Sequence, residues 1–431
     1  MNDYQSALDF LYTQLPMFQR AGAPAYKPGL DTSRALDKAF DYPHRAYKTI
    51  HVAGTNGKGS TSHTLAAVLQ SAGYRTGLYT SPHLVDFRER MRVNGKMISE
   101  EEVVDFVSRY RAMCLDLHPS FFELTMMMAF DFFARENVDI AIIEVGLGGR
   151  LDSTNIITPE ICVITNISYD HTAFLGDTLP MIATEKAGII KPHIPVVIGE
   201  ATGEVKQVFI DTAARENAPI IFAPQDLTVS PESRDGIMGH MYANTPFGPI
   251  WGELAGDYQT ANASTILTTL GEMRRRGIAT FSDADVASGF AAVSSSTGLL
   301  GRWMKVDDRP LTICDTGHNI GGWQYLSRQI AAQPGRKHMV IGFVNDKDID
   351  HILDLMPQDA RYYFTRAQIP RALHADALAA TAKEKGLHGE TFDDVPAAYE
   401  TAKRDADAGD TIFVGGSTFV VADFLAYIRS I

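Results

Sequence analysis

The sequence predicts an α/β protein with mainly parallel sheets, divided into two domains. Short apolar runs of strand length recur along the chain, without the polar alternation of a half-exposed strand. These runs lie at 47–53, 140–145, 160–167, 195–199 and 219–223. Helix-like stretches such as 60–73 and 100–117 separate them. Alternating strands and helices indicate a parallel sheet with right-handed crossovers and helices on both faces.

The alternating pattern is interrupted once, and the domain boundary follows later, at the segment 297–310. Residues 224–256 are rich in turn residues and predict short antiparallel strands, followed by a helix over 258–276. Strand patterns resume at 312–315, 338–344, 361–365 and 411–416. We therefore expect an N-terminal domain over 1–297 and a smaller C-terminal α/β domain over 298–431.

Composition and charge exclude several classes of protein. The 431 residues are 45% hydrophobic and 21% charged, which is typical of a globular chain. The formal net charge of −13 argues against a nucleic-acid partner. Three scattered cysteines form neither a disulfide framework nor a zinc cluster. Because we find neither a secretory signal nor an apolar run of about 18 residues, we expect a cytoplasmic protein with no membrane partner.

The sharpest motif is HVAGTNGKGST at 51–61, between an apolar strand and a helix pattern. Its glycines let backbone N–H groups approach phosphate oxygens at the helix N-terminus. Lys58 is placed to reach the terminal phosphates, and a hydroxyl of Ser60 or Thr61 to face Mg²⁺. The alternative is a glycine-rich turn with a solvated lysine. The predicted ATP-binding loop consists of Gly54, Thr55, Asn56, Gly57, Lys58, Gly59, Ser60 and Thr61.

The loop departs from the general phosphate-loop pattern in an informative way. Val52 stands at the first glycine position, and Gly59 separates Lys58 from Ser60. In this form GTNGKGS resembles the loop of folylpolyglutamate synthases and dihydrofolate synthases of the Mur ligase superfamily. Further segments follow in the family's order: TSPHL (80–84), RERMRVNG (88–95), EVGLGGRLDSTN (144–155), SYDHTAFLGDT (168–178), EKAGIIKP (185–192), DTGHN (315–319) and GGS (415–417). The resemblance implies a Mur-ligase-like P-loop domain with a mainly parallel sheet and a smaller C-terminal α/β domain.

Two residues that follow predicted strands are candidate metal ligands. Glu144 ends the run at 140–144, at the sheet edge where open α/β sheets bind ligands, and His171 lies beyond the next strand. From the residues alone, a surface carboxylate and a structural histidine stay open as alternatives. The resemblance implies that two magnesium ions are surrounded by Ser60, Ser81, Glu144 and His171, with Asp170 and Asn166 in support.

Lys186 lies in a helix-like segment, where an average lysine is a surface residue. In Mur-type ligases the matching lysine is carbamylated, which converts a cation into a carboxylate-like group near the metals. The resemblance therefore implies catalytic roles for Lys58, Lys186 and His171.

The acceptor-binding residues are implied by the resemblance alone. A solvated charge run is the alternative for 88–90, and a hydrophobic core is the alternative for the aromatic and Met residues of 121–133. At 126–133 we expect core packing for Met126, Met127, Phe130 and Phe133. The implied folate-binding residues are Arg88, Phe121, Phe122, Glu123, Thr125, Arg150 and Asp152.

In the second domain, Asp315 ends an apolar strand and begins the motif DTGHN. The family usually has His-Gln-Asn-Ala where this chain reads YQTANA (258–263), and usually alanine where Thr316 stands. The resemblance implies further nucleotide contacts at Asn262, Arg302, Asp315 and His318.

Together these features predict an ATP-dependent carboxylate–amine ligase of folate metabolism, a tetrahydrofolate synthase and dihydrofolate synthase. Its expected partners are ATP, L-glutamate and dihydropteroate or reduced folates, with Mg²⁺ as cofactor. The segment FFELT (121–125) resembles the two-activity bacterial enzymes, so we expect both activities. Three alternatives stay open: a cell-wall amino-acid ligase of the Mur type, which should carry a further N-terminal domain, a non-catalytic nucleotide-binding regulator, and a pure interaction module, for which the sequence offers neither a repeat nor an exposed apolar stripe.

Overall fold

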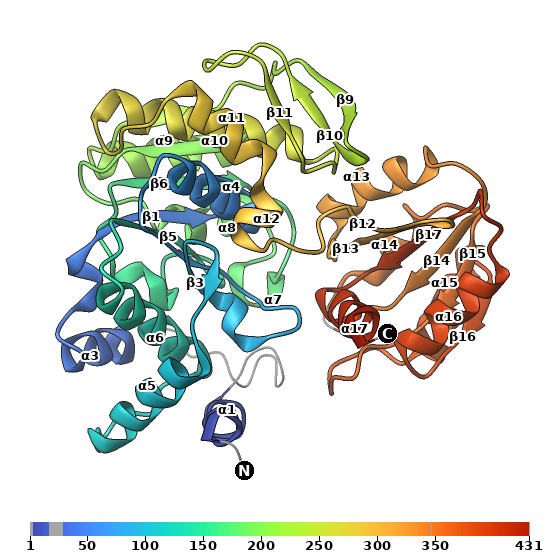
Figure 1. Ribbon diagram of the computed structural model, residues 1–431, viewed down its shortest axis with the longest axis horizontal. Helices are drawn as coiled ribbons and strands as arrows, with labels where there is room; N and C mark the ends of the chain where they lie inside the picture. Colours follow the sequence, from blue (N-terminus) through green and yellow to red (C-terminus); the bar gives the residue numbers. More distant parts are fainter. Residues whose placement is uncertain (1–2, 17–28, 346, 431) are drawn as a thin grey trace. The chain divides into compact units, whose positions relative to one another are not determined.

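The computed structural model describes residues 3–16, 29–345 and 347–430, and it divides into two compact units (Figure 1). The first unit comprises Met1–Ile167, Leu175–Glu253 and Thr260–Leu299. The second comprises Ser168–Phe174, Leu254–Gln259 and Leu300–Ile431. The sequence-based division at 297/298 did not include the two short segments that pack with the second unit, because only three-dimensional contacts assign them.

The first unit is built on an eight-stranded sheet in the order β4-β3-β2-β5-β1-β6-β7-β8. Six of its strands pair in parallel, while β3 is antiparallel to β2 and β4 to β3. The strands are β1 (Lys48–Ala53), β2 (Thr76–Tyr79), β3 (Met91–Val93), β4 (Lys96–Met97), β5 (Ile140–Glu144), β6 (Ile161–Asn166), β7 (Val196–Glu200) and β8 (Ile220–Phe222). The carboxyl ends of β2, β5, β1 and β6 therefore meet at one edge of the sheet, and the predicted α/β class is confirmed.

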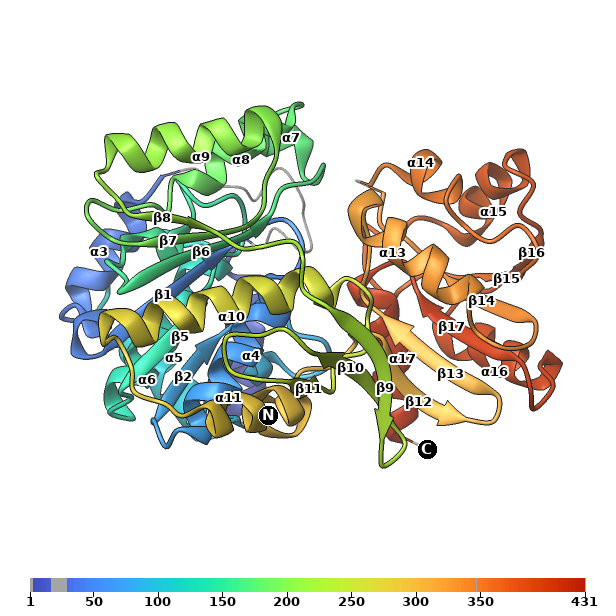
Figure 2. The ribbon, with the colours of Figure 1, turned by 90° about the horizontal axis from the view of Figure 1, so that it is seen from above.

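Helices cover both faces of this sheet. On the side of one face lie α1 (Asp3–Thr13), α3 (Asp31–Ala39), α5 (Glu100–Ala112), α6 (Phe121–Arg135), α8 (Leu179–Ala187) and α9 (Gly203–Arg215). Among them, α1 packs on α5, and both α3 and α5 pack on α6. The other packs on α4 (Lys58–Ser71), α10 (Gln259–Arg276) and α11 (Asp283–Ala291). Alternate residues of β5 belong to different cores, since Ala141 and Ile143 face α6 whereas Ile140 and Ile142 face α4. Figure 2 shows α9 and α10 on opposite sides of β6, β7 and β8.

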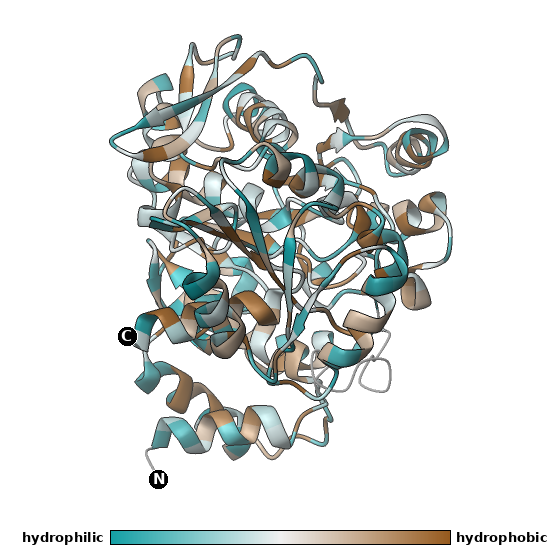
Figure 3. Cartoon of the chain, turned by 90° about the vertical axis from the view of Figure 1, so that its right-hand side faces the viewer, coloured by the Kyte–Doolittle hydropathy of each residue, from teal (hydrophilic) through white to brown (hydrophobic). Residues whose placement is uncertain are grey.

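Smaller elements complete the first unit. The antiparallel strands predicted for 224–256 are confirmed as β9 (Val229–Arg234), β10 (Ile237–Tyr242) and β11 (Ile250–Gly252). The helix α12 (Val293–Thr297) ends the unit, and short 3₁₀ helices are η2 (Pro43–Ala46), η3 (Phe87–Arg90) and η4 (Ser153–Ile156). In Figure 3, hydrophobic and hydrophilic residues alternate along several helices, as expected where one side packs on a sheet.

The second unit is a six-stranded sheet in the order β12-β13-β17-β14-β15-β16. Its strands are parallel except for β12, which is antiparallel to β13. The strands are β12 (Met304–Asp308), β13 (Leu311–Asp315), β14 (Lys337–Ile341), β15 (Arg361–Phe364), β16 (Gly389–Thr391) and β17 (Thr411–Gly415). The helices are α13 (Ile320–Ala331), α14 (Ile349–Leu353), α15 (Ala375–Glu384), α16 (Val395–Asp405) and α17 (Thr418–Ser430).

The short helix α7 (Thr172–Leu175) lies where the chain passes from the second unit back to the first. Among the described residues, none of the helices is long and apolar enough to span a membrane.

Candidate active site

The glycine-rich segment 54–57 joins the end of β1 to the start of α4. Gly54 has φ +144° and Gly57 has φ +84°, both in the region that favours glycine. A Cβ at Gly54 would lie 1.8 Å from the Thr165 Oγ1 atom, and a Cβ at Gly57 would lie 2.1 Å from the Asn262 Oδ1 atom. The loop is therefore packed closely against the end of β6 and the first turn of α10.

Backbone and side-chain hydrogen bonds hold this loop in shape. The Thr55 amide donates to the Asn166 carbonyl oxygen and the Asn56 amide to the Asn166 side chain, both at 2.9 Å. The Lys58 ammonium donates to the carbonyl oxygens of Gly54 and Thr55, both at 3.0 Å. Gly57 caps α4 without a side chain, so the first amides of the helix receive no side-chain cap from it. A helix start of this kind suits a phosphate group.

Two predicted metal ligands lie together at the edge of the same sheet. The Ser81 amide, which follows β2, donates to the Glu144 carboxylate at the end of β5 over 3.3 Å. Glu144 is 4% exposed and Ser60 is 1% exposed, in the first turn of α4. Because β2, β5 and β1 are neighbours, their ends bring these residues to one side of the phosphate loop.

The donor set at this edge suits magnesium better than a closed metal centre. Within residues 3–16, 29–345 and 347–430, no cluster of three or more His, Cys, Asp or Glu side chains could hold a metal ion. Mg²⁺ commonly uses one or two carboxylates together with phosphate oxygens and water. A buried carboxylate and two hydroxyl-bearing residues beside a phosphate loop therefore fit that ion.

Lys186 is buried near the C-terminal end of α8 and is 4% exposed, so the surface-lysine alternative is wrong. The loop after β5 packs on this part of the helix. A Cβ at Gly149 would lie 2.8 Å from the Glu185 carbonyl oxygen and 3.1 Å from the Lys186 Cα. The Arg150 amide donates to the Glu185 carbonyl at 2.7 Å, and the Arg150 guanidinium pairs with the Glu185 carboxylate at 2.8 Å.

The first turn of α6 brings one predicted acceptor residue to the loop after β5. A Cβ at Gly146 would lie 2.4 Å from the Phe122 ring, and the Tyr79 ring centroid lies 5.9 Å from that of Phe122. Phe121 is buried and stacks on Tyr12 at 5.6 Å. The core packing predicted from helical spacing is confirmed for Met126, Met127, Phe130 and Phe133.

Other predicted acceptor residues have partners within the protein. Glu123 forms a capping box with Ser120, at 2.8 and 3.2 Å, and also accepts from Ser33 at 3.3 Å. The Thr125 hydroxyl donates to the Phe122 carbonyl at 3.2 Å. Arg88 pairs with Asp86 at 2.6 Å. The roles of Arg88, Glu123 and Thr125 in acceptor binding stay predictions.

Asp152 shapes the loop that follows Glu144. Its Oδ2 atom accepts from the amides of Gly146 and Leu147 at 3.0 and 2.9 Å. Its Oδ1 atom accepts from the amide and the hydroxyl of Thr154, at 3.0 and 2.5 Å. Burial raises the pKa of Asp152, and the hydrogen bonds oppose that effect. Both carboxylate oxygens are therefore occupied by this chain, and direct contact with a folate stays a prediction.

In the second unit, Asp315 organises the predicted nucleotide contacts. Its carboxylate accepts from the Tyr258 hydroxyl at 2.6 Å, the Trp303 amide at 2.7 Å and the Gly317 amide at 2.8 Å. Burial raises the pKa of Asp315. The Arg302 guanidinium donates to the hydroxyl of Thr316, the position at which the resemblance implies an alanine.

A second cluster surrounds Asp170, also within the second unit. Its carboxylate contacts the Lys347 ammonium at 2.5 Å, the His318 ring at 3.2 Å and the Asn319 amide group at 3.0 Å. The His171 ring lies 3.8 Å from the same carboxylate. Burial alone would raise the pKa of Asp170, but the Lys347 charge and the histidines hold that pKa well below its usual range.

Sequence reasoning missed Lys347 in this cluster, although a signal existed. Lys347 lies three residues after the predicted strand 338–344. Glu144 and His171 were selected because they too lie at or after the ends of predicted strands. His171 belongs to the second unit, whereas Glu144, Ser81 and Ser60 belong to the first. Whether the four act on one metal centre stays a prediction.

The chain is similar to known proteins over most of its length. Residues 52–235 match the family model described as the Mur ligase middle domain, and residues 301–418 match the Mur ligase, glutamate ligase domain. The dihydrofolate synthase/folylpolyglutamate synthase of Escherichia coli is 34% identical over 383 residues, covering 88% of this chain and 86% of the relative. The protein of the same name in Bacillus subtilis is 31% identical, covering 97% of this chain and 98% of the relative.

Solved structures give the same result. E. coli FolC in complex with DHPP and ADP matches with a TM-score of 0.84 at 31% identity, covering 99% of this chain and 98% of the other. A folylpolyglutamate synthase of Mycobacterium tuberculosis complexed with ADP matches with a TM-score of 0.86 at 29% identity, with the same coverage. A bifunctional folylpolyglutamate synthase/dihydrofolate synthase with Mn, AMPPNP and L-glutamate bound matches with a TM-score of 0.81 at 30% identity, again with that coverage.

Proposed function

The chain belongs to the dihydrofolate synthase/folylpolyglutamate synthase family of Mur ligases, and on that basis we propose that it joins L-glutamate to dihydropteroate and to reduced folates with ATP. The observation that supports this most directly is the phosphate loop beside Glu144 and Ser81. There, a helix start without a side-chain cap, a lysine and a buried carboxylate meet at one sheet edge. We place the activity in the cytoplasm as part of the same proposal.

The reaction addresses the low reactivity of a carboxylate toward an amine. The γ-phosphoryl group of ATP passes to the acceptor carboxylate, which gives an acyl phosphate and ADP. The amine of L-glutamate then attacks the acyl carbon, phosphate leaves, and an amide forms with loss of a proton. Lys58 and the amides of the phosphate loop bind the phosphate groups and balance their charge.

The remaining residues act around these groups. Ser60, Ser81 and Glu144 would hold Mg²⁺ in the first unit, and we include His171 and a second ion as the family's pattern implies. Bound Mg²⁺ supplies charge stabilisation on the transferring phosphoryl group. Asn262, Arg302, Asp315 and His318 are the proposed nucleotide contacts. Phe122, beside the loop after β5, is the proposed acceptor contact for which the packing gives most support.

The test is ADP release by the full chain with ATP, Mg²⁺ and L-glutamate, with dihydropteroate or tetrahydrofolate as acceptor. Mass spectrometry of the product should show the addition of one glutamate to each acceptor. The matched control omits the acceptor. Turnover with only one acceptor would restrict the proposal to a single activity. If neither acceptor supports ADP release, the proposal is contradicted, and the cell-wall ligase or the nucleotide-binding regulator is favoured.

A further inference from the structure

Three buried polar side chains connect the middle of β1 to the loop that follows β5. His51 and Thr154 are fully buried, and Asp152 is 6% exposed. The His51 Nε2 atom lies 2.9 Å from the Thr154 hydroxyl, which lies 2.5 Å from the Asp152 carboxylate. All three residues belong to the first unit. The second oxygen of Asp152 accepts hydrogen bonds from the amides of Gly146 and Leu147.

We call the hydrogen-bonded series His51–Thr154–Asp152 the relay. The hydroxyl and carboxyl protons in it decide which atom of each pair is the donor. Both oxygens of Asp152 face N–H or O–H donors, so the carboxylate acts only as an acceptor. Thr154 therefore donates its single hydroxyl proton to Asp152. The Thr154 oxygen must accept from His51, which requires a proton on the His51 Nε2 atom.

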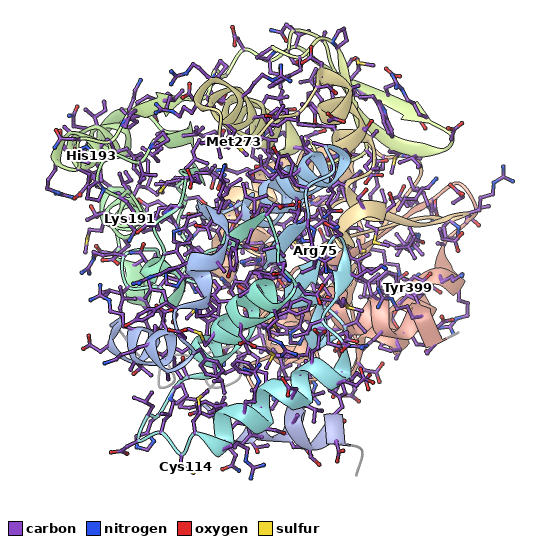
Figure 4. All side chains as sticks on the ribbon, turned by 60° about the vertical axis from the view of Figure 1, so that its left-hand side comes forward. Arg75, Cys114, Lys191, His193, Met273 and Tyr399 are labelled. Carbon is purple, nitrogen blue, oxygen red and sulfur yellow. The ribbon has the colours of Figure 1, made fainter. Side chains whose placement is uncertain are left out.

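The environment of His51 agrees with a neutral ring in this one tautomer. Burial, with a smaller effect of the Lys191 charge, lowers the pKa of His51 to about 3. The His51 Nδ1 atom is buried and, among the described side chains and backbone groups, has no hydrogen-bond partner. His51 pairs across the sheet with Cys162, whose thiol contacts the Ile189 carbonyl oxygen at 3.1 Å and takes no part in the relay. Lys191, labelled in Figure 4, donates to the Asn155 carbonyl at 3.0 Å and also lies outside the relay.

The loop held by the relay touches residues of the candidate site at three places. It begins directly after Glu144, the buried carboxylate that contacts Ser81. Gly146 lies against the Phe122 ring, so a displacement of the loop would move that ring or open a gap beside it. Gly149 lies against α8 at Lys186. Phe122 is the proposed acceptor contact, whereas the phosphate loop is held by its own hydrogen bonds to Asn166, so a shift of 145–149 acts first on the acceptor.

We propose that His51 is a positioning residue, which acts through Thr154 and Asp152 to hold the loop 145–149 in the conformation that binds the acceptor. The inference rests on the proposed function for the identity of the acceptor. Its competitor is a route along β1 itself, because His51 lies three residues before Gly54 of the phosphate loop. The two routes differ in outcome: the relay affects the KM of the acceptor, whereas the strand affects the KM of ATP.

Two substitutions of His51 separate hydrogen bonding from packing. His51→Leu removes the donor, while His51→Gln keeps an N–H group near the Nε2 position. We expect His51→Leu to raise the acceptor KM about tenfold, the size expected for loss of one buried hydrogen bond, with the ATP KM within about twofold. His51→Gln should restore most of the acceptor KM. Cys162→Ala, at the paired position on β6, is the matched control and should leave both KM values unchanged.

A double-mutant cycle with Thr154→Val tests the path. If the relay is the route, the double variant His51→Leu/Thr154→Val should show the same acceptor KM as either single variant. Fully multiplicative effects would overturn the proposal. So would an equal rise of both KM values in His51→Leu, or a failure of His51→Gln to restore the acceptor KM.

A measurement without substrate keeps this test separate from that of the proposed function. In protein labelled with ¹⁵N-histidine, the resonance lost in His51→Gln should show a neutral Nε2–H ring from pH 6 to 8. The same resonance should shift in Thr154→Val. A charged ring or the other tautomer would refute the relay even if the enzyme is active. If the relay is present and no acceptor is turned over, the proposed function fails instead.

Discussion

Replacing Lys347 with methionine tests the buried ion pair that anchors residues 168–174 to the second unit. Lys347 and Asp170 have side chains that are each 8% exposed, and their N–O distance is 2.5 Å. The substitution keeps most of the side-chain volume but leaves the Asp170 carboxylate without its cation. His318 and Asn319 still contact that carboxylate, at 3.2 and 3.0 Å.

The expected loss of stability follows from the charge left behind. At 2.5 Å and an effective dielectric constant of about 20, the gross attraction is roughly 7 kcal/mol, most of which offsets the desolvation of the two ions. Removing one partner of a buried pair costs about 3–5 kcal/mol. Since two polar contacts to Asp170 remain, we expect Lys347→Met to lower the free energy of unfolding of the second unit by about 3 kcal/mol.

Urea unfolding followed by tryptophan emission measures this loss. Trp303 and Trp323 belong to the second unit and Trp251 to the first, so the signal reports mainly on the second unit. The double variant Asp170→Asn/Lys347→Met should recover part of the loss, because no uncompensated charge is left. Lys385→Met is the matched control, since Lys385 pairs with Asp354 at the surface, and it should leave the urea midpoint unchanged. A wild-type midpoint for Lys347→Met would refute the reasoning.

The same pair predicts a dependence of stability on pH. Burial would raise the pKa of Asp170, but Lys347 and the histidines hold it well below the ordinary value. A carboxyl group with a depressed folded-state pKa stabilises the protein fully above its unfolded pKa, which is about 4. That stabilisation is lost as the pH falls toward the folded-state pKa. Between pH 5 and 3, the urea midpoint of the wild type should therefore decrease more steeply than that of Lys347→Met.

Three further predictions concern the phosphate loop and Lys186. Lys58→Ala should reduce kcat at least about a hundredfold with an unchanged urea midpoint, because the ammonium donates to two loop carbonyls and is not part of a core. Lys38→Ala, on an exposed side of α3, is the control, and near-normal turnover of Lys58→Ala would remove Lys58 from the phosphate site. Gly57→Ala places a Cβ 2.1 Å from the Asn262 side chain at φ +84°, so the Kd for ATP measured by calorimetry should rise about tenfold or more, whereas an unchanged Kd would show that the loop rearranges freely. Lys186→Ala should be nearly inactive, and added short carboxylates should partly restore its activity. Mass spectrometry of the intact wild-type protein in bicarbonate buffer should show the carbamate on Lys186. An active Lys186→Ala variant, or an active wild type without the carbamate, would contradict the proposed role.

The sequence was sufficient for the fold class and for most of the strands of the first unit. Uninterrupted apolar runs predicted parallel strands buried on both faces, and β1, β5, β6 and β7 confirm this. The run at 219–223 is instead the edge strand β8, whose residues are half-buried. Glu144 was selected from its place at a strand end and Ser81 from the family resemblance, and the adjacency of β2 and β5 places the Ser81 amide 3.3 Å from the Glu144 carboxylate. Such predictions succeed because a strand's burial and its C-terminal neighbours are local properties of the chain.

The partners of these residues were decided only by the tertiary structure. The sequence alone favoured a surface position for Lys186, but its side chain is buried in the fold. Nor did the sequence assign 168–174 to the second unit, where Lys347 pairs with Asp170. Likewise, nothing in the motif HVAGTNGKGST indicated that His51 contacts a threonine 103 positions later. The physical reason is that burial and hydrogen bonding depend on segments far apart in the chain. Periodicity and motif spacing describe only what lies within a few residues, so they identify the chemical groups but not the contacts that orient them.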